Sequence, residues 1–283
     1  MNNQLQNKPK FSLAIQTEGY KKLINNTLGD ANRAAKFIAA ISSAVATNPS
    51  LQECDAGTIL SGALLGEALN LSPSPQLGQY YLVPFNIKIG VDEQGKPIYA
   101  KQAQFQLGYK GYIQLAIRSG QYTKLNVLSI KDGELIKYDP LNEEIEVKLI
   151  EDEEKRESAQ TIGYYAMFEY ANGFRKSIYW TKSKMEKHAL KYSKGYAAKK
   201  GYTFWEKDFD AMAYKTMLRQ LISKWGIMSI DMQEAMIKDM AVVKEDGTYE
   251  YIDNQPTVII PSADEINAET TEPEIKKVNI NEL

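Results

Sequence analysis

Phe-Gln-Leu-Gly-Tyr-Lys-Gly-Tyr-Ile-Gln-Leu-Ala-Ile-Arg-Ser-Gly, residues 105–120, is the stretch that decides the fold. Apolar and polar residues alternate up to Leu107, which predicts a strand. A helical pattern of apolar residues follows Gly111, and Gly120 is well placed to end it. Gly108 and Gly111 allow the backbone to turn sharply and to approach a neighbouring segment closely. The sequence therefore predicts a strand, a tight turn and a short helix.

This strand–turn–helix carries two cations and two aromatic rings on stiff backbone, which are Lys110, Arg118, Tyr109 and Tyr112. Cations beside aromatic faces suit a polyanion that carries flat rings, and single-stranded nucleic acid is such a polyanion. An ordinary turn with solvated charges produces the same pattern, so both interpretations stay open for this stretch alone.

Working outward, residues 79–107 have the pattern of a long β-hairpin whose turn is Asp92-Glu93-Gln94-Gly95. We expect this hairpin to protrude beside a nucleic-acid groove, since its tip carries no apolar residue. Further strands are predicted over 121–150 and 160–181, and helices over 31–46, 55–69, 183–193 and 208–225. Asp30 and Asp55 are expected to cap the first two of these helices, and Ser183-Lys184-Met185-Glu186 predicts a capping box at the start of the third. The predicted fold class is α+β: N-terminal helices, a central antiparallel sheet with a protruding β-hairpin, and C-terminal helices.

Two helices carry further expectations. Gly57, Gly62 and Gly66 lie inside the 55–69 helix, and we attribute them to the close approach of another helix. On the 208–225 helix, Ala213 and Met217 belong to an apolar stripe that should face the core. Lys215 and Arg219 also step by four residues, and we expect them on the opposite, outer face.

Charge is distributed unevenly along the chain, although its formal net charge is only −2. Residues 175–224 hold thirteen bases and four acids, interleaved with aromatic residues from Tyr192 to Trp205, which is typical of a phosphate-binding groove. A solvated pair of helices is the alternative. Residues 143–157 hold eight acids and three bases, and we expect a solvated turn that points away from nucleic acid.

We predict three segments: a flexible N-terminus over 1–18, a main domain over 19–238, and an acidic, largely disordered tail over 239–283. The tail holds eleven acids and three bases, and its prolines argue against regular structure. On this interpretation, a chain that ends near Met240 should keep its activity.

Several classes of chemistry find no support. Cys54 and His188 are the only residues of their kinds, which disfavours disulfides, the usual zinc sites and Ser-His-Asp catalysis, and the single cysteine suits the cytoplasm. No Gly-x-x-x-x-Gly-Lys-Ser/Thr loop for ATP is present, and no apolar run is long enough to span a membrane. We expect no cofactor and no enzymatic activity. Two alternatives stay open: a metal-dependent nuclease using Asp139, Glu146 and Lys148, or a structural interaction protein.

Three stretches together resemble the RecT family of phage single-strand annealing proteins. They are Tyr81-Leu82-Val83-Pro84-Phe85, Tyr109-Lys110-Gly111 with its continuation to Gly120, and Met212–Arg219 with Trp225. The resemblance covers roughly residues 20–235. It implies ATP-independent annealing of complementary single strands in recombination, and a homo-oligomer that forms rings or helical filaments. It also implies single-stranded and annealed duplex DNA, a phage exonuclease and a host single-strand-binding protein as partners in a bacterial cell.

The candidate DNA-binding residues combine the strand–turn–helix with the basic block. Lysines and arginines are expected to hold phosphates and leave the base edges free for pairing. The candidates are Lys101, Tyr109, Lys110, Tyr112, Arg118, Lys182, Lys184, Lys191, Lys199, Lys200, Lys215 and Arg219.

Overall fold

The strand–turn–helix forms at the predicted place in the computed structural model, which describes residues 10–251. Strand β2 (Pro97–Leu107) runs through Gly108 into helix α5 (Tyr109–Arg118), and Gly120 follows with a φ of +68°. A Cβ on Gly108 would lie 2.1 Å from the carbonyl oxygen of Gly78, and one on Gly111 would lie 2.2 Å from that of Gln79. Both glycines are therefore required by the backbone that passes against the turn.

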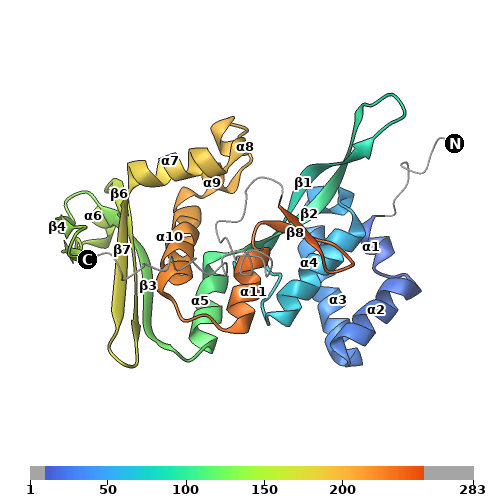
Figure 1. The fold of residues 1–283 in the computed structure, drawn as a ribbon, viewed down its shortest axis with the longest axis horizontal. Coiled ribbons are helices and arrows are strands. Elements are labelled where there is room, and N and C mark those ends of the chain that lie inside the picture. Colours follow the sequence, from blue (N-terminus) through green and yellow to red (C-terminus); the bar gives the residue numbers. More distant parts are fainter. Residues whose placement is uncertain (1–9, 252–283) are drawn as a thin grey trace, which may run out of the picture.

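The N-terminal part of the described chain is helical and occupies one end of the molecule (Figure 1). Asp30 caps α3 by accepting the N–H of Arg33 at 2.6 Å, and Asp55 caps α4 through Gly57 at 2.9 Å, so both predicted caps are confirmed. The elements are α1 (Phe11–Ala14), α2 (Glu18–Leu28), α3 (Ala31–Ala46), the 3₁₀ helix η1 (Pro49–Glu53) and α4 (Ala56–Ala68).

The predicted flexible N-terminus is corrected over residues 10–18. Phe11, Ala14 and Ile15 are buried in the core, because α1 packs its apolar side against α3 and α4. Residues 1–9 lie outside the described residues.

The long hairpin is confirmed and extends away from the body of the molecule (Figure 1). Strand β1 (Tyr80–Val91) pairs with β2 in antiparallel register from Tyr80–Leu107 to Val91–Pro97. Asp92 closes the turn by accepting the N–H groups of Gln94 and Lys96 at 3.0 and 2.7 Å. The protruding part carries few buried side chains, whereas its base belongs to the core.

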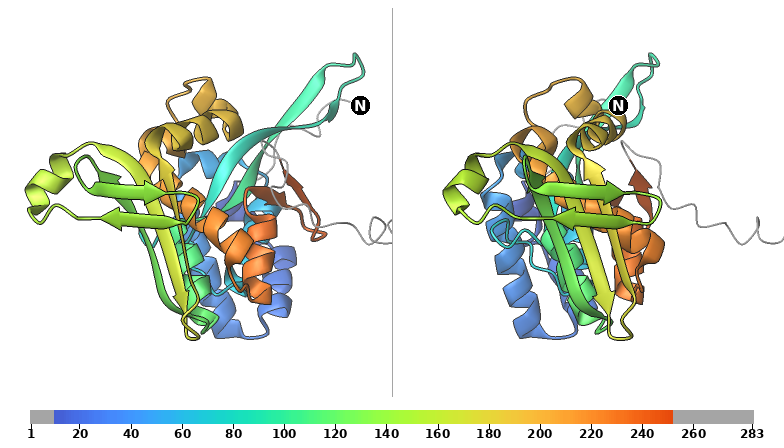
Figure 2. Two further views of the ribbon diagram at one scale, coloured as in Figure 1. Left: turned by 60° about the vertical axis from the view of Figure 1, so that its left-hand side comes forward. Right: turned by 90° about the vertical axis from the view of Figure 1, so that its left-hand side faces the viewer.

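The predicted α+β class is confirmed, and within residues 10–251 the antiparallel strands are divided among three sheets. One sheet has the order β1-β2-β8-β9, the second β3-β6-β7, and the third is the β4-β5 hairpin. Figure 2 shows the second and third sheets from two further sides. The bounds are β3 (Tyr122–Lys131), β4 (Leu135–Asp139), β5 (Glu144–Val147), β6 (Thr161–Tyr170), β7 (Arg175–Thr181), β8 (Ala241–Val243) and β9 (Tyr249–Tyr251).

In Figure 1, α10 and α11 lie between the sheets, α7, α8 and α9 lie above them, and α6 lies at the left end beside β4. Helix α7 has Thr181 as its N-cap, which accepts the N–H of Lys184 at 3.2 Å, so the predicted capping role of Ser183 is wrong. The bounds are α6 (Glu153–Ser158), α7 (Lys182–Tyr192), α8 (Lys194–Ala197), α9 (Phe204–Lys207), α10 (Phe209–Trp225) and α11 (Ile230–Lys238).

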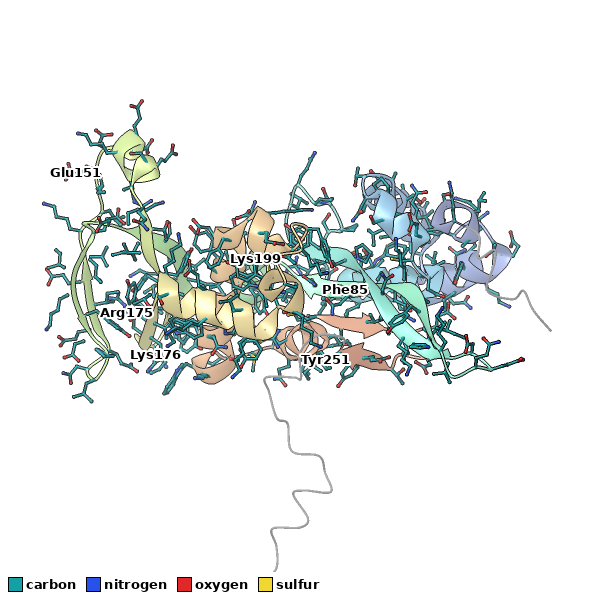
Figure 3. The ribbon with its side chains drawn as sticks, turned by 90° about the horizontal axis from the view of Figure 1, so that it is seen from above. Phe85, Glu151, Arg175, Lys176, Lys199 and Tyr251 are labelled. Carbon is teal, nitrogen blue, oxygen red and sulfur yellow. The ribbon has the colours of Figure 1, made fainter. Side chains whose placement is uncertain are left out.

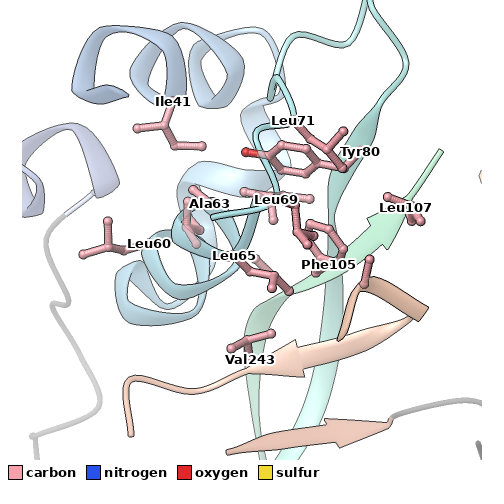
Figure 4. Close-up of a cluster of buried hydrophobic side chains, with 14 of the residues drawn as sticks. Ile41, Leu60, Ala63, Leu65, Leu69, Leu71, Tyr80, Phe105, Leu107 and Val243 are labelled. Carbon is pink, nitrogen blue, oxygen red and sulfur yellow. The ribbon is translucent and has the colours of Figure 1, made fainter. Parts of the chain in front are cut away.

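Helix α10 connects two hydrophobic clusters, and this decides the orientation of its charged residues. Leu218 and Ile222 belong to the larger cluster, which contains Tyr80, Phe105 and Leu107 (Figure 4). The predicted stripe of α10, from Ala213 through Met217 to Leu221, belongs to the second cluster, with side chains of β6 and α7. A helix that is apolar on two sides is enclosed. On the expected outer face, Lys215 is therefore buried and the side chain of Arg219 is only 15% exposed, which corrects the sequence interpretation.

The glycines of α4 allow close packing against a strand rather than against another helix. A Cβ on Gly66 would lie 2.4 Å from the ring of Tyr80, and one on Gly62 would lie 2.8 Å from Leu82, both on β1. The expected close approach is thus present, but the neighbouring element was predicted wrongly.

Gly66→Ala should lower the free energy of unfolding by about 1–3 kcal/mol, because the added methyl group overpacks against the ring of Tyr80. Gly19→Ala in α2 is the matched control, since a Cβ there meets nothing within 4 Å. It should leave stability unchanged or raise it by up to about 1 kcal/mol. Urea unfolding of both variants measures the difference, and equal effects would contradict the packing argument.

The predicted tail boundary is also corrected. Asp239 is fully buried, and β8 pairs with β2, where it buries Ala241, Val242 and Val243. Residues 239–251 therefore belong to the fold, and residues 252–283 lie outside the described residues. In the sequence, the high negative charge of residues 239–283 made the three consecutive apolar residues of β8 easy to overlook.

A chain that ends at Met240 should be much less stable than one that ends at Tyr251. The shorter chain exposes the surface that β8 covers, and each buried valine is worth about 1.5–3 kcal/mol. Thermal unfolding of the two truncations tests this. Equal melting temperatures would instead support the boundary predicted from the sequence, with the folded domain ending at residue 238.

Candidate nucleic-acid interface

A cleft of about 790 Å³ lies between the base of the β1–β2 hairpin and the segment from the end of α7 to α9. None of its described lining residues is acidic, whereas four are lysines: Lys101, Lys194, Lys200 and Lys207. Lys101 forms an ion pair with Glu53, but Lys200 and Lys207 form no ion pair within residues 10–251. The cleft is therefore a basic depression whose lining brings no carboxylate toward an anion.

Aromatic side chains line the same cleft. Tyr202 is 65% exposed and Phe204 is 37% exposed, so both present ring surface to solvent. The ring of Phe204 contacts that of Tyr81 on β1 at a centroid distance of 5.4 Å, which links the two walls. Exposed rings beside lysines provide stacking surfaces next to cations, which is the combination that single strands require.

The loop before α9 is fixed by hydrogen bonds from its backbone N–H groups to the side chain of Glu206 on α9. Gly201 has a φ of +74°, and Thr203 forms a capping box with Glu206. The Glu206 carboxylate accepts the N–H groups of Gly201 and Thr203 at 2.8 and 3.0 Å, and the Thr203 hydroxyl and these backbone bonds lower its pKa. The Glu206 carboxylate is thus bound to backbone donors, so the lysines around it determine the positive charge of the cleft.

A row of rings leads from β7 along α7 to the cleft. The rings of Trp180 and His188 are 5.5 Å apart, and those of His188 and Tyr192 are 4.5 Å apart. Lys184 lies over Trp180 at 4.3 Å and Lys191 over Tyr192 at 5.1 Å. Burial, with Arg219 and Lys191 nearby, lowers the pKa of His188 to about 4, so this ring is neutral at neutral pH. Tyr192 also lines the cleft, so the row extends it.

Comparison with known proteins decides the family. The model of the RecT family matches residues 35–258. The chain belongs to the RecT family. It is 43% identical over 231 residues to an uncharacterized protein, YqaK of Bacillus subtilis (strain 168), and this alignment covers 80% of the chain and 73% of YqaK. It is 31% identical over 191 residues to protein RecT of Escherichia coli (strain K12), covering 68% of the chain and 65% of RecT.

Membership of the RecT family brings general properties. RecT-family proteins generally anneal single-stranded DNA in recombination, and they are annealing proteins rather than classical enzymes. The family also implies binding of single-stranded DNA and oligomerisation. Within residues 10–251, no helix is long and apolar enough to cross a membrane.

The structure brings only part of the predicted site together. Lys101 and Lys200 line the cleft, and Lys199 precedes Lys200 in the same exposed loop. Three further candidates, Lys182, Lys184 and Lys191, lie on α7. Lys110 is exposed on α5, and Tyr109 beside it packs edge-on against Tyr214, with 5.7 Å between ring centroids. These two lie outside the lining of the cleft.

Three candidates are turned into the fold, which corrects the prediction for them: Tyr112 and Lys215 are buried, and the side chain of Arg219 is 15% exposed and paired with a buried carboxylate. All three bind the carboxylate of Asp239. Its Oδ1 accepts from Lys215 at 2.8 Å, and its Oδ2 accepts from Arg219 at 2.7 Å and from the Tyr112 hydroxyl at 3.0 Å. This buried ion cluster connects α5, α10 and the start of β8, so its role is structural.

Arg118 is also engaged within the fold. Its guanidinium donates to the carbonyl oxygens of Leu69 and Asn70, each at 2.6 Å, and so satisfies the C-terminal end of α4. Arg118 is nevertheless exposed and its guanidinium has further N–H donors, so its assignment as a phosphate ligand stays a prediction.

Sequence reasoning left out other lining residues: Lys207, Phe85, Asn86, Gln104 and Gln106. Lys207 is part of the basic block, and Phe85 ends the Tyr-Leu-Val-Pro-Phe stretch, so both carried a signal. The polar residues of β1 and β2 carried none, because a hairpin pattern does not say which face a cleft will use.

The nuclease alternative receives no support from the described residues. Asp139 accepts the N–H groups of Leu141 and Asn142 at 2.9 and 3.2 Å and caps the β4–β5 turn. In the same hairpin, Glu146 lies opposite Lys137 in register. Over residues 10–251, no group of three or more His, Cys, Asp or Glu side chains is arranged to hold a metal ion, and this holds for Asp139 and Glu146 too.

Proposed function

We propose that this protein binds single-stranded DNA in the cleft and anneals complementary strands without ATP. The observation that carries the proposal is the lining of the cleft, where lysines and exposed rings occur together and none of the described residues is an acid. Lysines hold phosphates whatever the sequence, and rings stack on base faces. The Watson–Crick edges then stay free to test a second strand, so pairing rather than protein supplies the specificity.

The other described DNA-binding candidates fit this proposal as an extended track. Lys182, Lys184 and Lys191 would continue the phosphate path along α7, whereas Lys199 and Lys200 lie at the cleft itself. Lys110 and Tyr109 would contact DNA outside the cleft. From family membership alone, we also propose that the protein acts in the bacterial cytoplasm with two partners, a phage exonuclease and a host single-strand-binding protein.

A fluorescence-transfer assay with two complementary labelled strands tests the activity. We expect the protein to accelerate annealing with EDTA present and no nucleotide added, and to leave both strands at full length in magnesium. An unchanged annealing rate would contradict the proposed function, and shortened strands in magnesium would instead support the nuclease alternative.

A further inference from the structure

We propose that an acidic segment of this chain, residues 264–274, docks in the cleft and competes there with single-stranded DNA. This regulation rests on the proposed function, because it acts at the same site. The segment holds five acids and no base, namely Asp264, Glu265, Glu269, Glu272 and Glu274. Repeated negative charges along a single chain are what a phosphate backbone also presents, so the same lysines can bind either one.

The lining of the cleft has the opposite charge. None of its described residues is acidic, and four are lysines. Two of these, Lys200 and Lys207, are exposed and form no ion pair within residues 10–251. Unpaired cations in a concave site raise the local concentration of anions. An acidic segment of the same chain is therefore attracted to the cleft.

The described chain ends next to the cleft. Its last strand, β9, pairs with β8, and Tyr251 lies opposite Ala241 in register. Met240, the residue before Ala241, lines the cleft. Paired strands lie about 4.8 Å apart, so the segment that follows Tyr251 begins close to one wall of the cleft. Figure 3 shows Tyr251 in the middle part of the molecule, together with Phe85 of the cleft and Lys199 of the adjoining loop.

The acidic segment is near enough in sequence to reach the cleft. Asp264 follows Tyr251 by thirteen residues. Such a stretch spans at most about 45 Å when extended, and about 20 Å on average as a random coil. A tether of this length gives an effective concentration on the order of millimolar. Exposed ion pairs are individually weak, but at such a concentration several of them together can occupy the lysines.

Single-stranded DNA has an advantage that the acidic segment lacks. Residues 264–274 contain no aromatic residue, whereas bases stack on exposed rings such as those of Tyr202 and Phe204. DNA therefore displaces the segment instead of being excluded by it. Anions that make only charge contacts are excluded more strongly than single strands, which also stack.

Removal of the segment tests the competition. A chain that ends at Tyr251 keeps β8 and β9, and at low salt it should bind a short oligo-dT about fivefold more tightly than the unmodified chain. The gain should shrink as salt screens the charges. Neutralising the five acids in the full chain should give a similar gain, and fluorescence anisotropy measures each affinity. This variant carries Asp264→Asn, Glu265→Gln, Glu269→Gln, Glu272→Gln and Glu274→Gln.

A matched control separates docking from general repulsion between acids and DNA. It neutralises five exposed acids outside the lining of the cleft, as Glu146→Gln, Glu151→Gln, Glu153→Gln, Glu154→Gln and Glu157→Gln. Its net charge equals that of the neutralised segment, but its affinity should change by less than about twofold. Equal gains in the two variants, or no gain on removal of the segment, would overturn the docking.

A photo-crosslink reports the contact itself in the absence of DNA. A photo-crosslinking phenylalanine analogue at Tyr202 should join to residues 264–274 of the same chain, and added oligo-dT should reduce the yield. The same analogue at Ile117, outside the lining of the cleft, is the control. No crosslink from Tyr202 to the segment, or crosslinks only between two chains, would overturn the docking. A chain whose segment crosslinks at Tyr202 but which binds no oligo-dT would support the docking and count against the proposed function instead.

Discussion

Asp239→Ala should lower the free energy of unfolding by about 3–5 kcal/mol, because it leaves two buried cations without their partner. Asp239 is fully buried and binds Lys215 and Arg219, whose side chains are 7% and 15% exposed. It also accepts the N–H of Leu107 at 2.8 Å, so its loss leaves a strand donor unpaired. Urea unfolding measures the change. Asp231→Ala, an exposed aspartate on α11, is the control and should change stability by less than about 1 kcal/mol.

The same cluster predicts a pH dependence. Burial tends to raise the pKa of Asp239, but Lys215 and Arg219 outweigh it and hold this pKa below its usual range. A carboxylate with a lowered pKa stabilises the folded state above its unfolded pKa, which is about 4. This contribution should be present at neutral pH and be lost as the pH falls below about 4. The Asp239→Ala variant has no such carboxylate, so its free energy of unfolding should fall less than that of the unmodified chain as the pH drops below about 4. An identical acid transition in both proteins would show that the cluster contributes no such dependence.

Lys200→Ala combined with Lys207→Ala should weaken single-strand binding about tenfold at low salt and reduce its salt dependence. The slope of log K against log salt should fall by about 0.7 for each lost phosphate contact, so by roughly 1.4 for both. All sequences should be affected alike, because phosphate contacts carry no base information. Fluorescence anisotropy over a range of salt concentrations measures both quantities.

The matched control removes two lysines from the acid-rich residues 143–157, which include α6. Lys148→Ala with Lys155→Ala changes the net charge equally, and both residues are exposed and lie outside the lining of the cleft. Its affinity for a short strand and its slope should stay close to those of the unmodified chain. If both double variants lose the same affinity, binding depends on overall charge and the cleft has no special role.

Local patterns predicted the local structure well. The strand–turn–helix at 105–120, the hairpin, and the Asp30 and Asp55 caps depend on neighbours in sequence, and all of them form. The α+β class followed from the order of these elements. The three separate sheets did not follow, because pairing of β8 with β2 joins residues more than a hundred positions apart.

The candidate site was predicted only in part, because solvent exposure depends on tertiary packing. Lys215 and Arg219 are four residues apart, as in an exposed basic stripe, and their partner Asp239 lies in the segment that the sequence predicted to be a disordered tail. Arg118 likewise turns back to α4, a neighbour that a pattern along α5 does not reveal. In contrast, Lys199 and Lys200 lie in a loop together with the exposed ring of Tyr202. The composition of this loop alone predicted that it contributes to a DNA-binding surface.

The location of the bound strand tests the central claim most directly. A photo-crosslinking phenylalanine analogue placed at Tyr202 should crosslink to single-stranded DNA, both oligo-dT and a mixed sequence, with similar yield. The same analogue at Ile117, which is 58% exposed at the end of α5 and outside the lining of the cleft, should give little product. Crosslinking at Ile117 with none at Tyr202, while the protein binds and anneals DNA normally, would contradict the placement of DNA in the cleft.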